Sequence, residues 1–175
     1  GDFIGEEKDG ETRIIRHPLI KDGELPLEPE EGVNTLWKAM EYATKEHPDR
    51  KFLGTRFILK SEKVEKPKKN PTDPTQYEIK NAFSDFEWET YSQIQEMMKT
   101  FARGLTTLGL CPDTISVHDG VFKFLGIWGK NKREWVIADG AAQAIGASVV
   151  TFYDTLGDDT VEYILEQTKI TTLVM

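Results

Sequence analysis

The strongest pattern in the chain is an apolar stripe at helical spacing between Thr90 and Leu108. Its members recur every three or four residues and are Tyr91, Ile94, Met97, Met98, Phe101, Leu105 and Leu108. Thr90 and Gln93 form an S/T-x-x-Q capping box, in which each side chain satisfies the other residue's free backbone N–H. Gly109 stands just past the end, where helices commonly turn left-handed. The stripe would also suit a lipid-binding face, but it is more typical of a helix packed on a core.

The last third of the chain alternates between strand-like and helix-like segments. Strands are predicted at Val121–Gly129, Ala147–Tyr153 and Ile170–Met175, and helices at Asn131–Ile145 and Asp158–Thr168. The first of these helices is apolar on nearly every side, as a buried helix is. Asn131 is placed as its N-cap and Glu134 as the N3 partner of that cap. The order predicts an α/β fold, a βαβαβ parallel core with right-handed crossovers. Because such sheets are usually covered on both faces, we expect a truncated domain.

The preceding part of the chain is predicted to hold a helix, a β-hairpin and an extended arm. Residues 1–32 are rich in acidic residues, glycine and proline and form the arm, in which "TRIIRHPLI" suits a short strand. Residues 33–175 are the incomplete domain. Its first helix runs from Asn34 or Thr35, one of them the N-cap, to Glu46.

The predicted hairpin pairs strands at 51–60 and 81–89. Between them, residues 61–80 are rich in lysine, proline and asparagine and are interpreted as a surface loop or mobile insert. Residues 111–120 are interpreted as a further loop.

Composition narrows the class of protein. The 175 residues are 38% hydrophobic and 30% charged, which is typical of a globular chain. The net charge of -8 argues against non-specific binding to nucleic acid or to a strongly anionic membrane, since both need a basic face. The single cysteine, Cys111, excludes an internal disulfide framework and fits a reducing, intracellular compartment.

The residues alone indicate no catalytic, cofactor-binding or metal site. Gly126–Asn131 reads "GIWGKN", but its glycine spacing differs from a P-loop and no hydroxyl follows the lysine, so a tight turn into a helix is favoured. Asp154 follows a strand at the edge where open α/β sheets bind ligands. A phosphoacceptor there would need an acidic pair for Mg²⁺ that the first strand does not supply, so Asp154 or Thr155 is interpreted as a helix cap. The three histidines are interpreted as surface residues and are His17, His47 and His118.

Four stretches, in this order and spacing, carry a family resemblance. They are "FLGTR" (Phe52–Arg56), "FEWETYSQIQEMMKTFARGLTTLGL" (Phe86–Leu110), "GIWGKNKREWVIADGAAQAIGASVV" (Gly126–Val150) and "YDTLGDDTVEYIL" (Tyr153–Leu165). Together they resemble the amino-terminal region of eukaryotic long-chain fatty-acid–CoA ligases, of the adenylate-forming superfamily. The combination of "YDTLG" and "NKREWVIAD" is specific to the long-chain branch. Two departures are Thr151-Phe152, where the family has a proline-containing pair, and the lysine-rich insert.

The resemblance implies the amino-terminal part of a large two-domain enzyme that converts fatty acid, ATP and CoA to acyl-CoA, AMP and diphosphate through an acyl-adenylate. ATP, Mg²⁺ and CoA are then expected for the full-length protein and none for this piece, which we expect to be inactive alone. The family's phosphate-binding loop and catalytic lysine match no position here, so no catalytic or nucleotide-binding residue is transferred. The turn Tyr153, Asp154 and Thr155 is the one candidate functional feature, either shaping the acyl or CoA region or serving only as a turn.

The resemblance also implies partners and a location. These are a long-chain fatty acid as substrate and peripheral association with the cytosolic face of a membrane such as the endoplasmic reticulum. No nucleic-acid partner is expected, because of the net negative charge. The exposed edge of the third strand is expected to pair with sequence outside this chain or with another copy. Alternatives are a non-catalytic binding or scaffold module on the same fold and a small flavodoxin- or receiver-like domain. The last lacks its phosphate loop and acidic pair.

Overall fold

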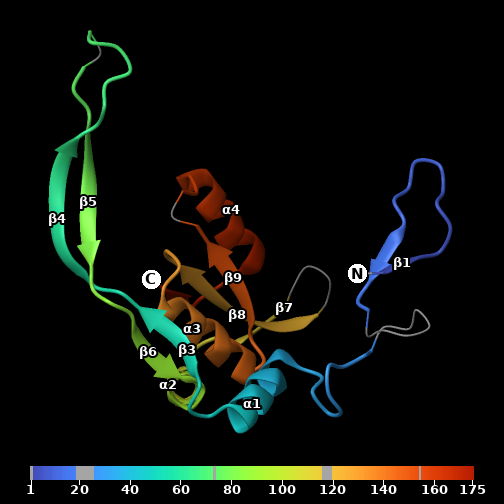
Figure 1. The fold of residues 1–175 in the computed structure, drawn as a ribbon. Helices are drawn as coiled ribbons and strands as arrows, with labels where there is room; N and C mark the ends of the chain where they lie inside the picture. The colour runs from blue at the N-terminus through green and yellow to red at the C-terminus, as the bar shows by residue number, and fades with distance from the viewer. Residues whose placement is uncertain (1, 19–25, 73, 116–119, 154) are drawn as a thin grey trace. The chain divides into compact units, whose positions relative to one another are not determined.

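The computed structural model describes residues 2–18, 26–72, 74–115, 120–153 and 155–175 (Figure 1). The chain divides into two compact units, Gly1–Tyr42 and Ala43–Met175. In the first unit, strands β1 (Asp2–Ile4) and β2 (Ile14–Arg16) pair antiparallel, so the expected short strand is present. Three of the four apolar side chains of this hairpin, Phe3, Ile14 and Ile15, are more than half exposed, and Ile4 is half-buried. The hairpin therefore has no apolar core of its own.

Helix α1 (Leu36–Glu46) begins where its cap predicts. The Lys38 backbone N–H donates to Thr35 Oγ1 at 3.1 Å, so Thr35, of the two candidates, caps the helix. Pro48 lies two residues beyond the last helical residue.

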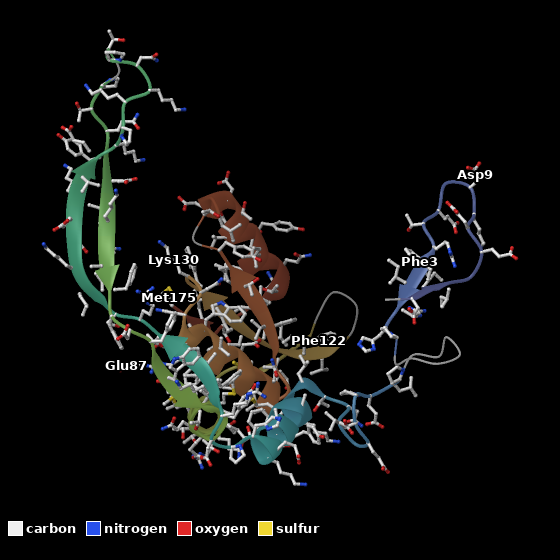
Figure 2. The ribbon with its side chains drawn as sticks, viewed as in Figure 1. Phe3, Asp9, Glu87, Phe122, Lys130 and Met175 are labelled. Carbon is white, nitrogen blue, oxygen red and sulfur yellow. The ribbon has the colours of Figure 1, made fainter. Side chains whose placement is uncertain are left out.

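The predicted β-hairpin is confirmed, but each of its strands is divided in two. Strand β3 (Lys51–Thr55) pairs antiparallel with β6 (Glu87–Thr90), and β4 (Ile58–Glu65) pairs antiparallel with β5 (Tyr77–Phe83). The prediction of a loop across residues 61–80 is wrong at its two ends, since residues 61–65 belong to β4 and residues 77–80 to β5. These strands could not be recognised from composition, because a two-stranded ribbon buries little side-chain surface. Both of its faces therefore accept lysine and glutamate (Figure 2).

Helix α2 (Tyr91–Thr107) has the predicted capping box. Gln93 N–H donates to Thr90 Oγ1 at 3.3 Å, and Thr90 N–H donates to Gln93 Oε1 at 2.8 Å. Gly109 has a φ of 64°, the left-handed end that the sequence predicts. The stripe packs on a core, with Ile94, Met98 and Leu105 all buried.

The parallel core is confirmed. It is formed by β8 (Val121–Trp128), α3 (Arg133–Ala144), β9 (Ser148–Phe152), α4 (Asp158–Thr168) and β10 (Leu173–Val174). Strand β8 is central, with β9 and β10 parallel to it on either side. Gly126 stands opposite both Val150 of β9 and Leu173 of β10.

Three local predictions in this region are wrong. The expected loop at 111–120 contains a strand, β7 (Asp113–Ile115), antiparallel to β8. The predicted cap of α3, Asn131 with Glu134 as its N3 partner, does not form. The helix starts one residue later, with Lys132 at the N-cap and no side-chain cap bond, and Glu134 falls at the second helical position. Helix α4 is capped by Gly157, so Thr155 lies two residues too early to cap it.

The main core lies between β8 and helices α2 and α3. Leu125 and Ile127, alternate residues of β8, join Leu105 of α2 with Ala138 and Ala142 of α3 in one buried cluster. The buried positions of α3 are small, Ala138, Gly140, Ala141 and Ala142, which lets neighbouring elements approach it closely. Helix α3 is apolar on nearly every side because all of its residues except Glu134 are buried or half-buried. None of the helices in the described ranges has the length and apolar character needed to cross a bilayer.

Candidate functional site

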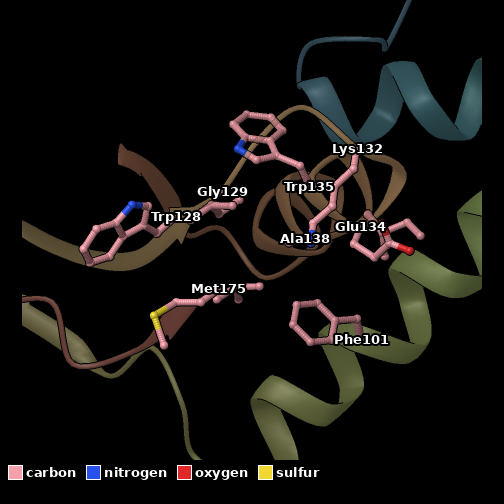
Figure 3. Close-up of a pocket in the computed structure, with 11 residues that line it drawn as sticks. Phe101, Trp128, Gly129, Lys132, Glu134, Trp135, Ala138 and Met175 are labelled. Carbon is pink, nitrogen blue, oxygen red and sulfur yellow. The ribbon is translucent and has the colours of Figure 1, made fainter. Parts of the chain in front are cut away.

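A cavity of about 320 Å³ opens at the carboxyl end of β8 (Figure 3). Its lining is mostly apolar and aromatic, from Phe101, Ile127, Trp128, Gly129, Lys132, Glu134, Trp135, Ile137, Ala138, Val174 and Met175. These residues come from α2, the end of β8, the first turns of α3, and β10. The carboxyl ends of parallel strands are where open α/β sheets bind ligands.

The local sequence explains the shape of the cavity. Strand β8 ends at Trp128, and the chain leaves it through Gly129 before α3 begins at Arg133. The segment "GIWGKN" is therefore a strand end and a short connection into a helix, as predicted. Trp135 and Ala138 then lie one helical turn apart and present one wall to the cavity.

The polar rim of the cavity carries one anion and one cation, Glu134 and Lys132. The pKa of Glu134 is lowered by a hydrogen bond to its own backbone N–H and by the Arg133 guanidinium, whose Nη2 lies 3.0 Å from its Oε1. Arg133 also donates to Glu89 of β6, and this bond raises the pKa of the arginine. The Glu89–Arg133–Glu134 contacts therefore tie the start of α3 to the β3–β6 hairpin.

The site suits an apolar group with a polar edge, and it does not fit the phosphates of a nucleotide. The lining contains one ammonium group, of Lys132, against the carboxylate of Glu134. Across the described ranges, there is no group of three or more His, Cys, Asp or Glu side chains that could share a metal ion. His17 and His47 are exposed, as predicted, and His118 lies outside the described residues.

The predicted functional turn lies one strand away from the cavity. Tyr153 is 65% exposed, Thr155 is exposed, and the Leu156 N–H closes the turn on Tyr153 C=O at 3.2 Å. Asp154 lies outside the described residues. The preceding residue, Phe152, is buried and its ring centroid is 6.0 Å from that of Trp128 in the cavity wall. The structure thus links the turn to the cavity through Phe152 but places neither Tyr153 nor Thr155 in its lining, and the role of the turn stays a prediction.

The cavity itself was not predicted from the sequence. Its lining comes from segments up to 74 residues apart, from Phe101 to Met175, and no local motif joins them. The available signal was the pair of tryptophans, Trp128 and Trp135, seven residues apart across a strand end.

We expect Asp139 to make stability depend on pH. Burial raises the pKa of its carboxyl, opposed by the 2.8 Å hydrogen bond from Gln143 Nε2. A raised pKa in an acid means that the folded state favours the neutral form. The contribution of Asp139 to folding stability is therefore fully present below the ordinary pKa of 3.8, and it is lost as the pH rises through the pKa of the folded state. Asp139→Asn keeps an oxygen acceptor for Gln143 without the charge.

Asp139→Asn should therefore be more stable than the parent protein at neutral pH, with the difference vanishing below pH 3.8. Urea unfolding at the two pH values measures this. A variant that is less stable at neutral pH would contradict the burial argument. Asp158→Asn, at an exposed position in the first turn of α4, is the control and should not gain stability.

The AMP-binding enzyme family matches residues 65–175, which is more than half of the chain. The chain therefore belongs to the AMP-binding enzyme family. It is 27% identical over 157 residues to long chain acyl-CoA synthetase 4 of Arabidopsis thaliana, covering 90% of this chain and 19% of that protein. It is 27% identical over 167 residues to fatty acyl-CoA synthetase B of Dictyostelium discoideum, covering 95% and 21%. The chain thus spans about a fifth of the length of these curated relatives.

Solved structures confirm the fold class. The adenylation domain of a carboxylate reductase from Mycobacterium chelonae superposes with a TM-score of 0.58 at 19% identity, over 83% of this chain and 19% of that one. The A-PCP didomain of a carboxylic acid reductase from Segniliparus rugosus gives 0.56 at 18% identity, over 83% and 18%. The α/β core is therefore part of an adenylate-forming fold, as the sequence resemblance implies.

Proposed function

We propose that the whole protein is an ATP-dependent long-chain fatty-acid–CoA ligase. In the first step, a fatty-acid carboxylate oxygen attacks the α-phosphorus of ATP, and diphosphate leaves with the electron pair of the broken P–O bond. In the second, the thiolate of CoA attacks the acyl carbon, the acyl–phosphate C–O bond breaks, and AMP leaves. Activation is needed because a carboxylate is a poor electrophile until AMP becomes its leaving group.

One observation carries the proposal: acyl-CoA synthetases of plants and Dictyostelium match 90% or more of the chain. Membership of the AMP-binding family supports ATP as a substrate. Mg²⁺, CoA and the fatty acid follow from the names and chemistry of the relatives and belong to the proposal. In this reading the chain supplies the β9–β8–β10 core of the large domain, and the reacting groups lie elsewhere in the protein.

Fatty-acid-dependent exchange of labelled diphosphate into ATP tests the first step. The full-length protein with palmitate and Mg²⁺ should catalyse exchange, and the chain Gly1–Met175 alone should not. Exchange by neither protein would favour the alternative of a non-catalytic binding or scaffold module. Exchange by the isolated chain would show that this part of the fold carries reacting groups, against the proposal.

The proposal includes a location and two associations. We place the protein inside the cell, at the cytosolic face of a membrane such as the endoplasmic reticulum, as a peripheral protein. Strand β10 pairs with β8 within the described ranges, and its second edge suits pairing with sequence outside this chain or with another copy.

The turn after β9 gives a sharper test in the full-length protein. If the turn shapes the acyl or CoA region, Asp154→Ala should keep normal stability and raise the KM for fatty acid or CoA about tenfold or more, as loss of a positioning contact does. Steady-state kinetics for each substrate and thermal unfolding measure the two effects separately. Asp49→Ala, at an exposed position in a different turn, is the matched control and should leave both KM values unchanged. Loss of folding with unchanged KM in the remaining active protein would reduce the turn to a structural role.

A further inference from the structure

The two faces of the β4–β5 ribbon differ in their apolar content. One face is mainly charged, while the second combines polar side chains with most of the large apolar ones. The first face carries the cross-strand pairs Lys60–Ala82, Glu62–Lys80 and Val64–Glu78. The second face carries the pairs Ser61–Asn81, Lys63–Ile79 and Glu65–Tyr77. Since side chains alternate between faces, Tyr77, Ile79 and Phe83 share the second face. Ile58, paired with Phe83, joins them. All four of these apolar side chains contact water, with exposed fractions of 50% for Tyr77, 62% for Ile79, 44% for Phe83 and 57% for Ile58.

Exposed aromatic rings continue from this second face along the β3–β6 hairpin. Phe86 and Trp88 have ring centroids 5.5 Å apart and are 53% and 44% exposed. Gly54 has no Cβ, and atoms of both rings lie 3.0 Å from the position that a Cβ would occupy there. Both rings therefore lie over the backbone of β3. We call the six residues Ile58, Tyr77, Ile79, Phe83, Phe86 and Trp88 the aromatic ribbon face.

Cations lie over the rings of this face. The Arg56 guanidinium carbon is 5.1 Å from the Phe83 centroid and 5.3 Å from that of Phe86. Lys51 Nζ lies 5.6 Å from the Trp88 ring, and Lys63 Nζ lies 4.3 Å from the Tyr77 ring. Aromatic rings interleaved with lysine and arginine are typical of surfaces that sit between lipid and water.

The tip of the ribbon adds a concentration of positive charge. Lys66, Lys68 and Lys69 line one hollow together with Pro67, Pro74 and Gln76, and all three lysines are exposed. The segment 58–83 holds six lysines against four acidic residues, in a chain whose net charge is -8. The whole-chain charge, which argues against a strongly anionic partner, is thus reversed locally on this ribbon.

We propose that the aromatic ribbon face and its lysine tip dock on a phospholipid bilayer that contains anionic headgroups. The lysines contact headgroup phosphates, while the exposed rings and Ile79 enter the interface between headgroups and acyl chains. A bilayer interface fits better than a protein groove because it accepts aromatic rings interleaved with cations and supplies phosphates beside them. This inference rests on the peripheral membrane association proposed above and identifies its surface.

Vesicle binding by the 175-residue chain tests the proposal without ATP, fatty acid or CoA, so its failure is distinct from failure of the ligase proposal. The chain should sediment with vesicles of phosphatidylcholine and phosphatidylserine, and more weakly with phosphatidylcholine alone. Each lysine near an anionic surface contributes about fivefold, so K66Q/K68Q/K69Q should weaken binding about a hundredfold. The charge-matched variant K38Q/K45Q/K99Q, changed on helices α1 and α2, should weaken it much less.

Two further variants test the apolar part. Ile79→Ser should weaken binding to both kinds of vesicle, and Trp88→Phe should retain binding but reduce the quenching of tryptophan fluorescence by brominated lipid. Circular dichroism checks that each variant is folded. Binding to neither vesicle, or equal binding by the two triple variants, would overturn the proposal. A chain that is dimeric without lipid and becomes monomeric on Ile79→Ser, with vesicle binding unchanged, would instead assign the face to a second copy.

Discussion

Leu125→Ala should lower the free energy of unfolding by about 2–5 kcal/mol, the range for removing a fully buried leucine side chain. Leu125 is 0% exposed at the centre of β8, the strand to which β9 and β10 both pair. It packs in one cluster with Leu105 and Ala142, so both packed helices lose contacts. Small neighbours on α3 leave few atoms able to move into the space, which favours the upper part of the range.

Urea unfolding followed by circular dichroism measures this loss. Leu27→Ala is the matched control, because Leu27 is fully exposed and the same truncation there should change stability by less than about 0.5 kcal/mol. Similar losses in the two variants would contradict the placement of the core between β8 and the helices.

Gly140→Ala should also destabilise the protein, against the intrinsic preference of a helix for alanine. A Cβ at Gly140 would lie 2.9 Å from Met98 Cγ and 2.5 Å from Met98 Cε, because α3 and α2 are in close contact there. Met98 is only 3% exposed, so its side chain has little room to move. Overpacking costs about 1–3 kcal/mol, and alanine regains about 0.8–1 kcal/mol of helix propensity. We expect a net loss of about 1 kcal/mol, within a range of about 0–2 kcal/mol.

Gly104→Ala is the control for the Gly140 prediction. It lies in α2 with open space around its Cβ position, so it should stabilise the protein by about 0.5–1 kcal/mol. The double variant M98A/G140A should be more stable than the sum of its single effects, since the clash is removed. A stabilising Gly140→Ala would contradict the close α2–α3 packing.

The elements that the sequence predicts well are those whose signals are local. The capping box of Thr90 and Gln93 marks the start of α2, and α4 has the predicted bounds, Asp158–Thr168. A cap bond and a helical stripe depend on residues within one or two turns, so they can be recognised without knowing the fold.

The features that sequence reasoning missed depend on distant contacts. The expected cap at Asn131 does not form, since α3 begins at Arg133, and the partner of Arg133, Glu89, lies 44 residues earlier in the chain. Strands β4 and β5 carry little apolar signal because they pair only as a ribbon, where polar residues suit both faces. The cavity at the end of β8 requires Phe101 and Met175 to meet, which follows only from the packed fold.

Formation of acyl-CoA by the full-length protein tests the central claim most directly. Purified protein incubated with palmitate, ATP, Mg²⁺ and CoA should give palmitoyl-CoA, AMP and diphosphate in equal amounts, as detected by mass spectrometry. Omitting either ATP or CoA should abolish the thioester. A folded full-length protein that forms no acyl-CoA or acyl-adenylate from any long-chain fatty acid would contradict the ligase assignment.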